Sequence, residues 1–406
     1  MPSIVFVAPI HASATLRFVQ AAASIPGVRC GLVSQEPGES LPADLRQKLA
    51  AHWRVEDAFN SDQLAAAVQA LSRTIGPVSR LLGILEQLQV PLAEARRKLG
   101  IPGLTPEVAN NFRDKALMKT ILRQHGLPCA KHALAHSADE ALSFASQVGF
   151  PLVIKPQAGA GAKATFRVDD LPALRQALQV HQPTAAHPTL VEEFVVGDEF
   201  AFDSIAVDGR VRWHSFTRYL PTPLEVLRNP WIQWCVVLPR SIDEPRYRAF
   251  REIGAKALSV LGLDTAMAHM EWFQRRDGSF AISEVAARPP GAQFTTLLSY
   301  AHDADFYSLW ARLMATGELH APERRHAVGA AYLRGQGTGR IVAVHGLDEA
   351  QREMGGLVVE ARLPQKGQAP ADTYEGDGYV IFRHDDTAVV ERALARTISL
   401  VRVELA

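Results

Sequence analysis

Short apolar runs alternate with amphipathic stretches along the first hundred residues. The apolar runs have the β-rich composition of buried strands, and the stretches between them have the spacing of helices. The strands are expected over residues 4–8, 28–34 and 78–85, and the helices over 16–23, 44–51, 62–72 and 91–99. Alternation of this kind predicts an α/β fold with a doubly wound parallel sheet. Because the last helix ends in basic residues followed by Gly100, we place the end of this domain at residue 104.

Beyond residue 105 the pattern changes. It predicts one amphipathic helix and then strands that are separated by glycine-containing turns. The helix is expected over 114–125, and a short apolar strand over 151–156. Two further strand pairs flank Asp-Gly dipeptides, which are strong hairpin signals. These pairs cover residues 202–207 with 211–216 and 269–273 with 280–285. The pattern predicts a second domain over residues 105–320.

The last part of the chain starts with a polar, basic stretch at residues 321–326, which is typical of a linker. Residues 328–406 are again β-rich, and one closing helix is expected over 387–400. We therefore predict a small C-terminal α+β domain over residues 321–406.

Composition narrows the classes of protein that fit. Hydrophobic residues make up 47% and charged residues 21% of the 406 residues, which is the balance of a folded globular protein. Basic and acidic residues number 43 each, so no net field favours nucleic acid or an anionic membrane as a partner. No apolar run reaches the roughly 20 residues that span a bilayer. The three cysteines have no metal-binding spacing, and the chain opens without the basic region of a signal peptide, so we expect a cytoplasmic protein.

Two lysines occupy positions where a fixed positive charge suits a triphosphate. Lys115 opens the helix that follows Asp114, and Lys155 ends a strand between Ile154 and Pro156. For Lys155 taken alone, a solvent-exposed strand end is an equally good interpretation.

The segment 157–164 consists of small residues except for Gln157 and Lys163. Backbone N–H groups in such a segment can approach an anion closely, and the segment can fold over it. Gly159 and Gly161 are therefore candidate phosphate contacts, and Lys163 is a further candidate cation. The spacing of a Walker A loop is absent, and a simple hairpin tip is the alternative.

Acidic residues gather in two further segments. Residues 190–199 mix apolar and acidic side chains, so that backbone groups could bind an adenine edge and a carboxylate could bind ribose hydroxyls. Solvated acidic residues at a strand end are the alternative.

Glu271 and Glu284 fall on the two strands of the second predicted hairpin, at the same end. Two close carboxylates repel unless a cation lies between them, and carboxylate oxygens suit Mg²⁺. Arg288, which follows on the same segment, could clamp a carboxylate or a phosphate, although a surface arginine is the simpler reading.

In this order and spacing the residues resemble the ATP-grasp superfamily. The resemblance rests on Arg-Asp-Lys-x-x-Met-Lys at residues 113–119, on an apolar strand ending in Lys-Pro, on Glu-Glu-Phe with a later Glu, and on Glu-x-x-x-Arg-Pro-x-Gly at residues 284–291. It covers roughly residues 105–317. It implies an ATP-grasp fold with a Rossmann-like pre-ATP-grasp domain in front and a lid subdomain over about residues 125–195.

The resemblance also implies roles for individual residues, and it implies ATP and Mg²⁺, or Mn²⁺, as cofactors. The phosphates would be held by the lysines and the glycine-rich loop, that is by Lys115, Lys155, Gly159, Gly161 and Lys163. Adenine and ribose would be held by a strand and its continuation, with Glu192, Glu193, Val195 and Glu199. The metal would be ligated by Glu271 and Glu284, and Arg288 would steady the substrate carboxylate. Many members have Asn two residues after the second metal glutamate, where this chain has Ala286. The second metal site would then use water or a different side chain, or bind the metal more weakly.

The sequence therefore predicts a carboxylate–amine ligase similar to the L-amino-acid ligases, which would form an acyl phosphate and release ADP and phosphate. Its partners would be small-molecule carboxylate and amine substrates, and a homodimer is compatible with the sequence. A carboxylation like that of biotin carboxylase, with bicarbonate as the phosphorylated group, is the first alternative. The second alternative is a catalytically silent ATP-binding protein. Ala286 favours this alternative, and the full set of lysines and glutamates disfavours it.

Overall fold

The N-terminal part of the chain forms a parallel sheet in the strand order β3-β2-β1-β4. The computed structural model describes residues 1–157, 165–229 and 232–406. The elements of this part are β1 (Ser3–Val7), α1 (Ser13–Ala23), β2 (Arg29–Ser34), α2 (Ala43–Lys48), β3 (Ala51–Arg54), α3 (Ser61–Ile75), β4 (Val78–Leu82) and α4 (Gln89–Leu99). The predicted doubly wound parallel sheet is confirmed.

The expected helix over 44–51 is wrong over its last three residues. α2 ends at Lys48, and Ala51 begins the edge strand β3, which pairs with β2. The four residues of β3 are half-buried or exposed and carry no apolar run. A strand that lies at a sheet edge is held by backbone pairing, so its sequence lacks the hydrophobic pattern of the central strands.

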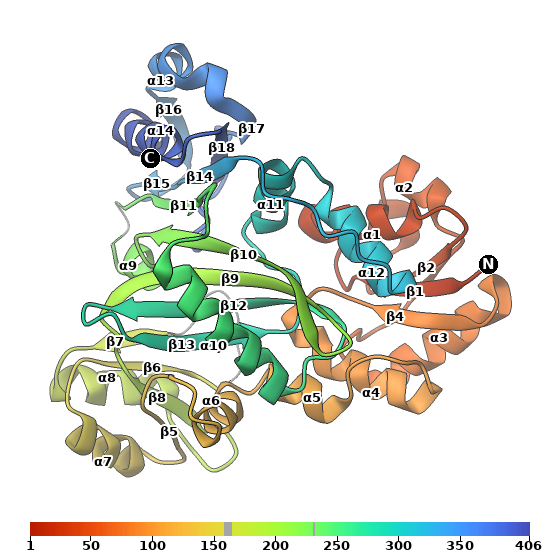
Figure 1. Cartoon of the computed structure of the whole chain (residues 1–406), viewed down its shortest axis with the longest axis horizontal. Helices are drawn as coiled ribbons and strands as arrows, with labels where there is room; N and C mark the ends of the chain where they lie inside the picture. The colour runs from red at the N-terminus through yellow and green to blue at the C-terminus, as the bar shows by residue number, and fades with distance from the viewer. Residues whose placement is uncertain (158–164, 230–231) are drawn as a thin grey trace.

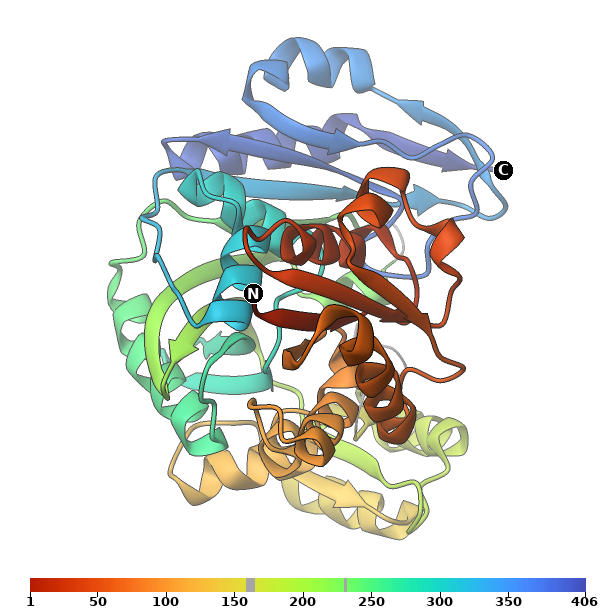
Figure 2. The ribbon, with the colours of Figure 1, turned by 90° about the vertical axis from the view of Figure 1, so that its right-hand side faces the viewer.

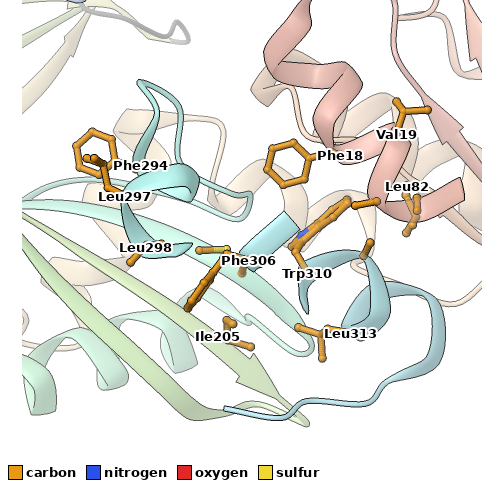
Figure 3. Close-up of a cluster of buried hydrophobic side chains, with 14 of the residues drawn as sticks. Phe18, Val19, Leu82, Ile205, Phe294, Leu297, Leu298, Phe306, Trp310 and Leu313 are labelled. Atoms are coloured by element: carbon orange, nitrogen blue, oxygen red, sulfur yellow. The ribbon is translucent and has the colours of Figure 1, made fainter. Parts of the chain in front are cut away.

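The two faces of this sheet are covered by helices from different parts of the chain. Val5 and Val7 pack in one cluster with residues of α3 and α4. On the other face the sheet meets α1 and also α12 (Phe306–Thr316), which comes from far along the chain. Trp310 of α12 packs edge-on against Phe18 of α1, with ring centroids 5.2 Å apart (Figure 3). The hydrophobic cluster is thus continuous from the N-terminal sheet to the central sheet.

A smaller antiparallel sheet, in the order β5-β8-β6-β7, follows and is covered by α7 and α8. It lies beside the central sheet, at the bottom of Figures 1 and 2. The elements of this part are α5 (Pro106–Asn111), α6 (Lys115–Gln124), β5 (His132–Ala135), α7 (Ala138–Val148), β6 (Leu152–Pro156), β7 (Phe166–Val168), α8 (Leu171–His181) and β8 (Thr189–Glu193).

The central sheet is antiparallel throughout and runs in the order β13-β12-β9-β10-β11-β14-β18-β17. Its first half, with the neighbouring helices, consists of β9 (Gly197–Val207), β10 (Arg210–Leu220), α9 (Pro223–Arg228), β11 (Trp234–Leu238), α10 (Pro245–Leu261), β12 (Ala266–Arg275), β13 (Phe280–Ala286) and α11 (Phe294–His302). Both predicted hairpins are present. Asp208 and Gly209 have positive φ at the first turn, the conformation that explains the Asp-Gly signal.

The C-terminal strands β14, β18 and β17 extend the central sheet, whereas β15, β19 and β16 form a small sheet of their own. The elements of this part are β14 (Ala327–Leu333), β15 (Gly335–Gln336), β16 (Ile341–His345), α13 (Leu347–Met354), β17 (Val358–Arg362), β18 (Gly378–His384), α14 (Thr387–Leu400) and β19 (Arg402–Leu405). The closing helix α14 has the predicted bounds. A second helix, α13, was not predicted, because its short polar sequence buries only Met354. The domain boundaries at 104 and 320 stay predictions.

The two faces of the central sheet differ in chemistry. On one face, which α10 covers (Figure 1), Phe200, Phe202 and Trp272 are packed. The rings of Trp272 and Phe250 stack with their centroids 3.9 Å apart. Side chains alternate along a strand, so the residues next to these aromatics point to the opposite face. In β9 and β12 those residues include Glu199 and Glu271. Among the described residues, no helix combines the length and apolar composition needed to cross a membrane.

Candidate active site

A cavity of about 1120 Å³ lies on the polar face of the central sheet, and residues of the N-terminal and smaller sheets also line it. The structure brings every described residue of the predicted site to this cavity: Lys115, Lys155, Glu192, Glu193, Val195, Glu199, Glu271, Glu284 and Arg288. Gly159, Gly161 and Lys163 lie outside the described residues. The roles assigned to all these residues stay predictions.

A β-bulge brings the two expected metal glutamates face to face. From Gln274 to Trp272, β12 pairs with β13 in one register, and between Trp272 and Glu271 that register shifts by one residue. In the unshifted register Glu271 would lie opposite Ser283. The bulge places Glu284 opposite Glu271 instead, so that both carboxylates project from the same face of the sheet. The buried Lys119 fixes this irregular backbone, because its Nζ donates to the carbonyl of Ser283 over 2.7 Å.

Three carboxylates, those of Glu199, Glu271 and Glu284, line this cavity. Glu199 of β9 projects beside Glu271, since it pairs with Phe273 two residues along β12. Burial and the negative charge of Glu271 raise the pKa of Glu199 well above its ordinary value. Within the described ranges, no three His, Cys, Asp or Glu side chains converge closely enough to hold a metal by themselves. A hard cation held by two glutamates and completed by phosphate oxygens and water is consistent with this donor set.

The structure places His269 opposite Ala286 in the β12–β13 ladder. Its Nδ1 lies 2.8 Å from Oδ1 of Asp203, a residue that is fully buried. Burial opposes protonation of His269, but Asp203 outweighs it and raises the pKa of the imidazole to about 9. The pair with Asp203 fixes the orientation of this imidazole, whose Nε2 lies 3.8 Å from Oε1 of Glu271.

Lys115 forms an ion pair with the second glutamate that is expected to bind a metal. Its Nζ donates to Oε1 of Glu284 over 2.7 Å, and both groups line the cavity. Burial opposes ionisation of Glu284, but the ammonium groups of Lys115 and Lys155 outweigh it and lower its pKa to about 2. Glu284 is therefore a carboxylate at neutral pH, the form that binds a metal.

Glu192 joins two buried lysines. One of its oxygens lies 2.9 Å from Nζ of Lys155 and the other lies 3.2 Å from Nζ of Lys119. Burial opposes ionisation of Glu192, but the two ammonium groups outweigh it and lower the pKa of the carboxyl. The side chain of Glu192 thus holds the ammonium group of Lys155 at the cavity wall. Val195 lies in the connection between β8 and β9, and Glu193 pairs with Arg275 over 2.7 Å.

Glu192→Gln is expected to destabilise the fold by about 3–5 kcal/mol, because removing the shared carboxylate leaves two buried ammonium groups without a counter-charge. Chemical denaturation measures this change. The matched control is the neighbouring Glu193→Gln, in which a partly exposed pair with Arg275 is lost and a change below about 1 kcal/mol is expected. Equal free energies of unfolding for Glu192→Gln and wild type would show that Glu192 is not the counter-charge that Lys119 and Lys155 share.

Sequence reasoning missed Glu86, which links the N-terminal sheet to the site. It follows β4 in a short 3-10 helix and is almost fully buried. Its carboxylate accepts from Arg113 over 2.7 Å and from Arg288 over 3.0 Å, so it sets the position of the predicted carboxylate clamp. Glu86 lies beyond the carboxyl end of β4, and β4 lies on the opposite side of β1 from β2. This switch in strand order is where ligand sites occur in parallel sheets, and it is the signal that could have identified Glu86.

Comparison with known proteins identifies the central part of the chain. Residues 120–302 match the model of the ATP-grasp domain. The L-arginine-specific L-amino acid ligase of Bacillus subtilis is 22% identical over 260 residues, which is 62% of this chain and 62% of that ligase. This chain thus spans less than two thirds of the length of that relative.

Two solved structures share the complete fold. The L-amino acid ligase from Bacillus licheniformis superimposes with a TM-score of 0.80 at 19% identity, covering 100% of this chain and 99% of that one. The N5-carboxyaminoimidazole ribonucleotide synthetase from Thermotoga maritima gives a TM-score of 0.72 at 18% identity, covering 100% of both chains. The predicted fold class is thereby confirmed. Residues 120–302 thus match the ATP-grasp domain, and the chain has the ATP-grasp fold.

Proposed function

We propose that the protein is an ATP- and Mg²⁺-dependent carboxylate–amine ligase that acts on amino acids through an acyl phosphate and releases ADP and phosphate. The observation that carries the proposal is the meeting of Lys115, Lys155, Glu271, Glu284 and Arg288 in one cavity. Lysines for phosphates, carboxylates for a metal and an arginine for a substrate carboxylate are the parts that phosphoryl transfer to a carboxylate requires.

The charges of the site support transfer of the γ-phosphoryl group. Lys155 is held by Glu192 and Lys115 by Glu284, so both ammonium groups have fixed positions from which they can neutralise the inner phosphates. Preorganised charges of this kind lower the barrier without reorganising during the reaction. Glu271 and Glu284 would hold Mg²⁺, which when bound would offset the negative charge of the triphosphate.

Arg288 would receive the substrate carboxylate. One of its terminal nitrogens donates to Glu86 over 3.0 Å and the other donates to the carbonyl of Pro289 over 2.9 Å, so the guanidinium is fixed at the cavity wall. A carboxylate is a poor electrophile because oxide would have to leave, and phosphorylation converts that oxygen into a good leaving group. The amine nitrogen then attacks the acyl carbon, the C–N bond forms and the C–O bond to phosphate breaks.

ADP release tests the proposal directly. Purified protein with ATP and Mg²⁺ is offered single amino acids, amino-acid pairs and bicarbonate, and ADP is followed by a coupled assay. The proposal expects ADP formation that depends on a carboxylate together with an amine. ADP release with bicarbonate alone would favour carboxylation, and nucleotide binding without turnover on any substrate would favour a silent ATP-binding protein.

A further inference from the structure

Aromatic side chains close the end of the cavity formed by the central sheet and the C-terminal part of the chain. Trp234 packs edge-on against Tyr219, with ring centroids 5.4 Å apart, and against Tyr374, with centroids 4.7 Å apart. Phe294 packs against Tyr219 at 5.9 Å, and all four rings line the cavity. The proposed roles in phosphoryl transfer use none of these residues. Their interlocked packing makes a fixed apolar wall rather than a loose surface patch.

A carboxylate lines the same cavity as this wall. Glu375 is half-buried and follows Tyr374 in the connection between β17 and β18. Within the described part of the chain, no hydrogen bond or ion pair holds its side chain. Burial raises the pKa of Glu375. A carboxyl group in apolar surroundings without a partner is costly unless a ligand supplies one, and the ligand group that a carboxylate binds best is a cation.

Tyr374 connects this carboxylate to the site of phosphoryl transfer. Burial and the charge of Glu271 raise the pKa of its phenol, and the charge of Arg288 opposes that rise. Tyr374, Glu271 and Arg288 all line this cavity, so a group bound at Glu375 would lie in the same cavity as the metal glutamate and the carboxylate clamp.

We propose that Glu375 and the aromatic wall formed by Tyr219, Trp234, Phe294 and Tyr374 are the subsite for the amine substrate, with the ammonium group held by Glu375 and an aromatic or large apolar side chain packed on the wall. This inference rests on the proposed ligase function. An ammonium group is attracted both by the carboxylate and by the faces of aromatic rings. The nitrogen must lose a proton before it attacks an acyl phosphate, and the carboxylate beside it is a base that can take that proton.

Calorimetric titration with 2-phenylethylamine tests the subsite, because this amine has no carboxylate and cannot be phosphorylated as the other substrate. The full-length protein is saturated with ADP and Mg²⁺ beforehand. Wild type is expected to bind the amine at least about tenfold more tightly than Glu375→Gln, and more tightly than it binds 2-phenylethanol, which lacks the ammonium group. Asp372→Asn is the matched control, since Asp372 is an exposed carboxylate of the same connection.

Equal amine affinity in wild type and Glu375→Gln would overturn the subsite, and so would wild type that binds neither probe. In turnover, Glu375→Gln is expected to raise the KM of the amine substrate about tenfold or more while leaving the KM of ATP unchanged. Amine binding is measured without catalysis, so the two proposals fail separately. Glu375-dependent binding without any ADP release would reject the ligase function alone, and ligase turnover with unaltered amine KM in Glu375→Gln would reject the subsite alone.

Discussion

Glu284→Gln is expected to reduce ligase turnover about 1000-fold, which corresponds to about 4 kcal/mol of transition-state stabilisation. The amide keeps the shape of the side chain but removes the charge that would balance the metal. Glu284 faces Glu271 across the bulge, and its pKa of about 2 keeps it ionised throughout the physiological range. The measurement is kcat at saturating ATP and Mg²⁺.

The control for this variant is Glu225→Gln, which changes an exposed carboxylate at the edge of the same cavity. It is expected to retain the turnover of wild type. Because Glu284 also pairs with Lys115, circular dichroism of Glu284→Gln must first show an intact fold. A folded variant with undiminished kcat would remove Glu284 from the metal site.

Lys155→Ala is expected to weaken ATP binding by roughly 2–4 kcal/mol, or roughly 30- to 1000-fold in Kd. The lysine ends β6, is buried and is fixed by Glu192, so little freedom is lost when it engages a phosphate. Lys115 opens a helix and is shared with Glu284, and we expect a smaller effect from Lys115→Ala. Titration calorimetry with ATP measures both changes.

Lys131→Ala is the control for loss of a lysine, because Lys131 is exposed and does not line the cavity. Its ATP affinity is expected to equal that of wild type. If Lys155→Ala binds ATP as wild type does, Lys155 does not contact the nucleotide.

Each feature that the sequence predicted is marked by a pattern of residues that are close together in the sequence. Lys155 ends an uninterrupted apolar run, and Asp277-Gly278 lies between the two strands that carry Glu271 and Glu284. Such patterns depend on a few neighbouring residues, so they can be read without the fold. The α/β order of the first hundred residues is local in the same sense, since alternating strands and helices have few ways to pack.

The features that the sequence did not reveal depend on contacts between distant segments. The bulge at Ser283 is stabilised by Lys119 across 164 residues, and no local pattern marks it. Glu86 reads as an ordinary acidic residue until Arg288 approaches it, although their separation is 202 residues. The return of α12 to the N-terminal sheet is likewise set by tertiary packing (Figure 3). The same holds for the entry of Glu375 into the cavity.

The path of a carboxylate oxygen tests the central claim, that the carboxylate is activated as an acyl phosphate. The substrate is labelled with ¹⁸O in its carboxylate, the reaction is run with unlabelled ATP and the products are analysed by mass spectrometry. Attack of the carboxylate on the γ-phosphorus leaves one of its oxygens in the phosphate when the amine displaces it, so the account predicts one ¹⁸O in inorganic phosphate for each turnover. Label in AMP would mean an acyl adenylate, and turnover with label in neither product would mean that no phosphorylated carboxylate forms; either result would contradict the account.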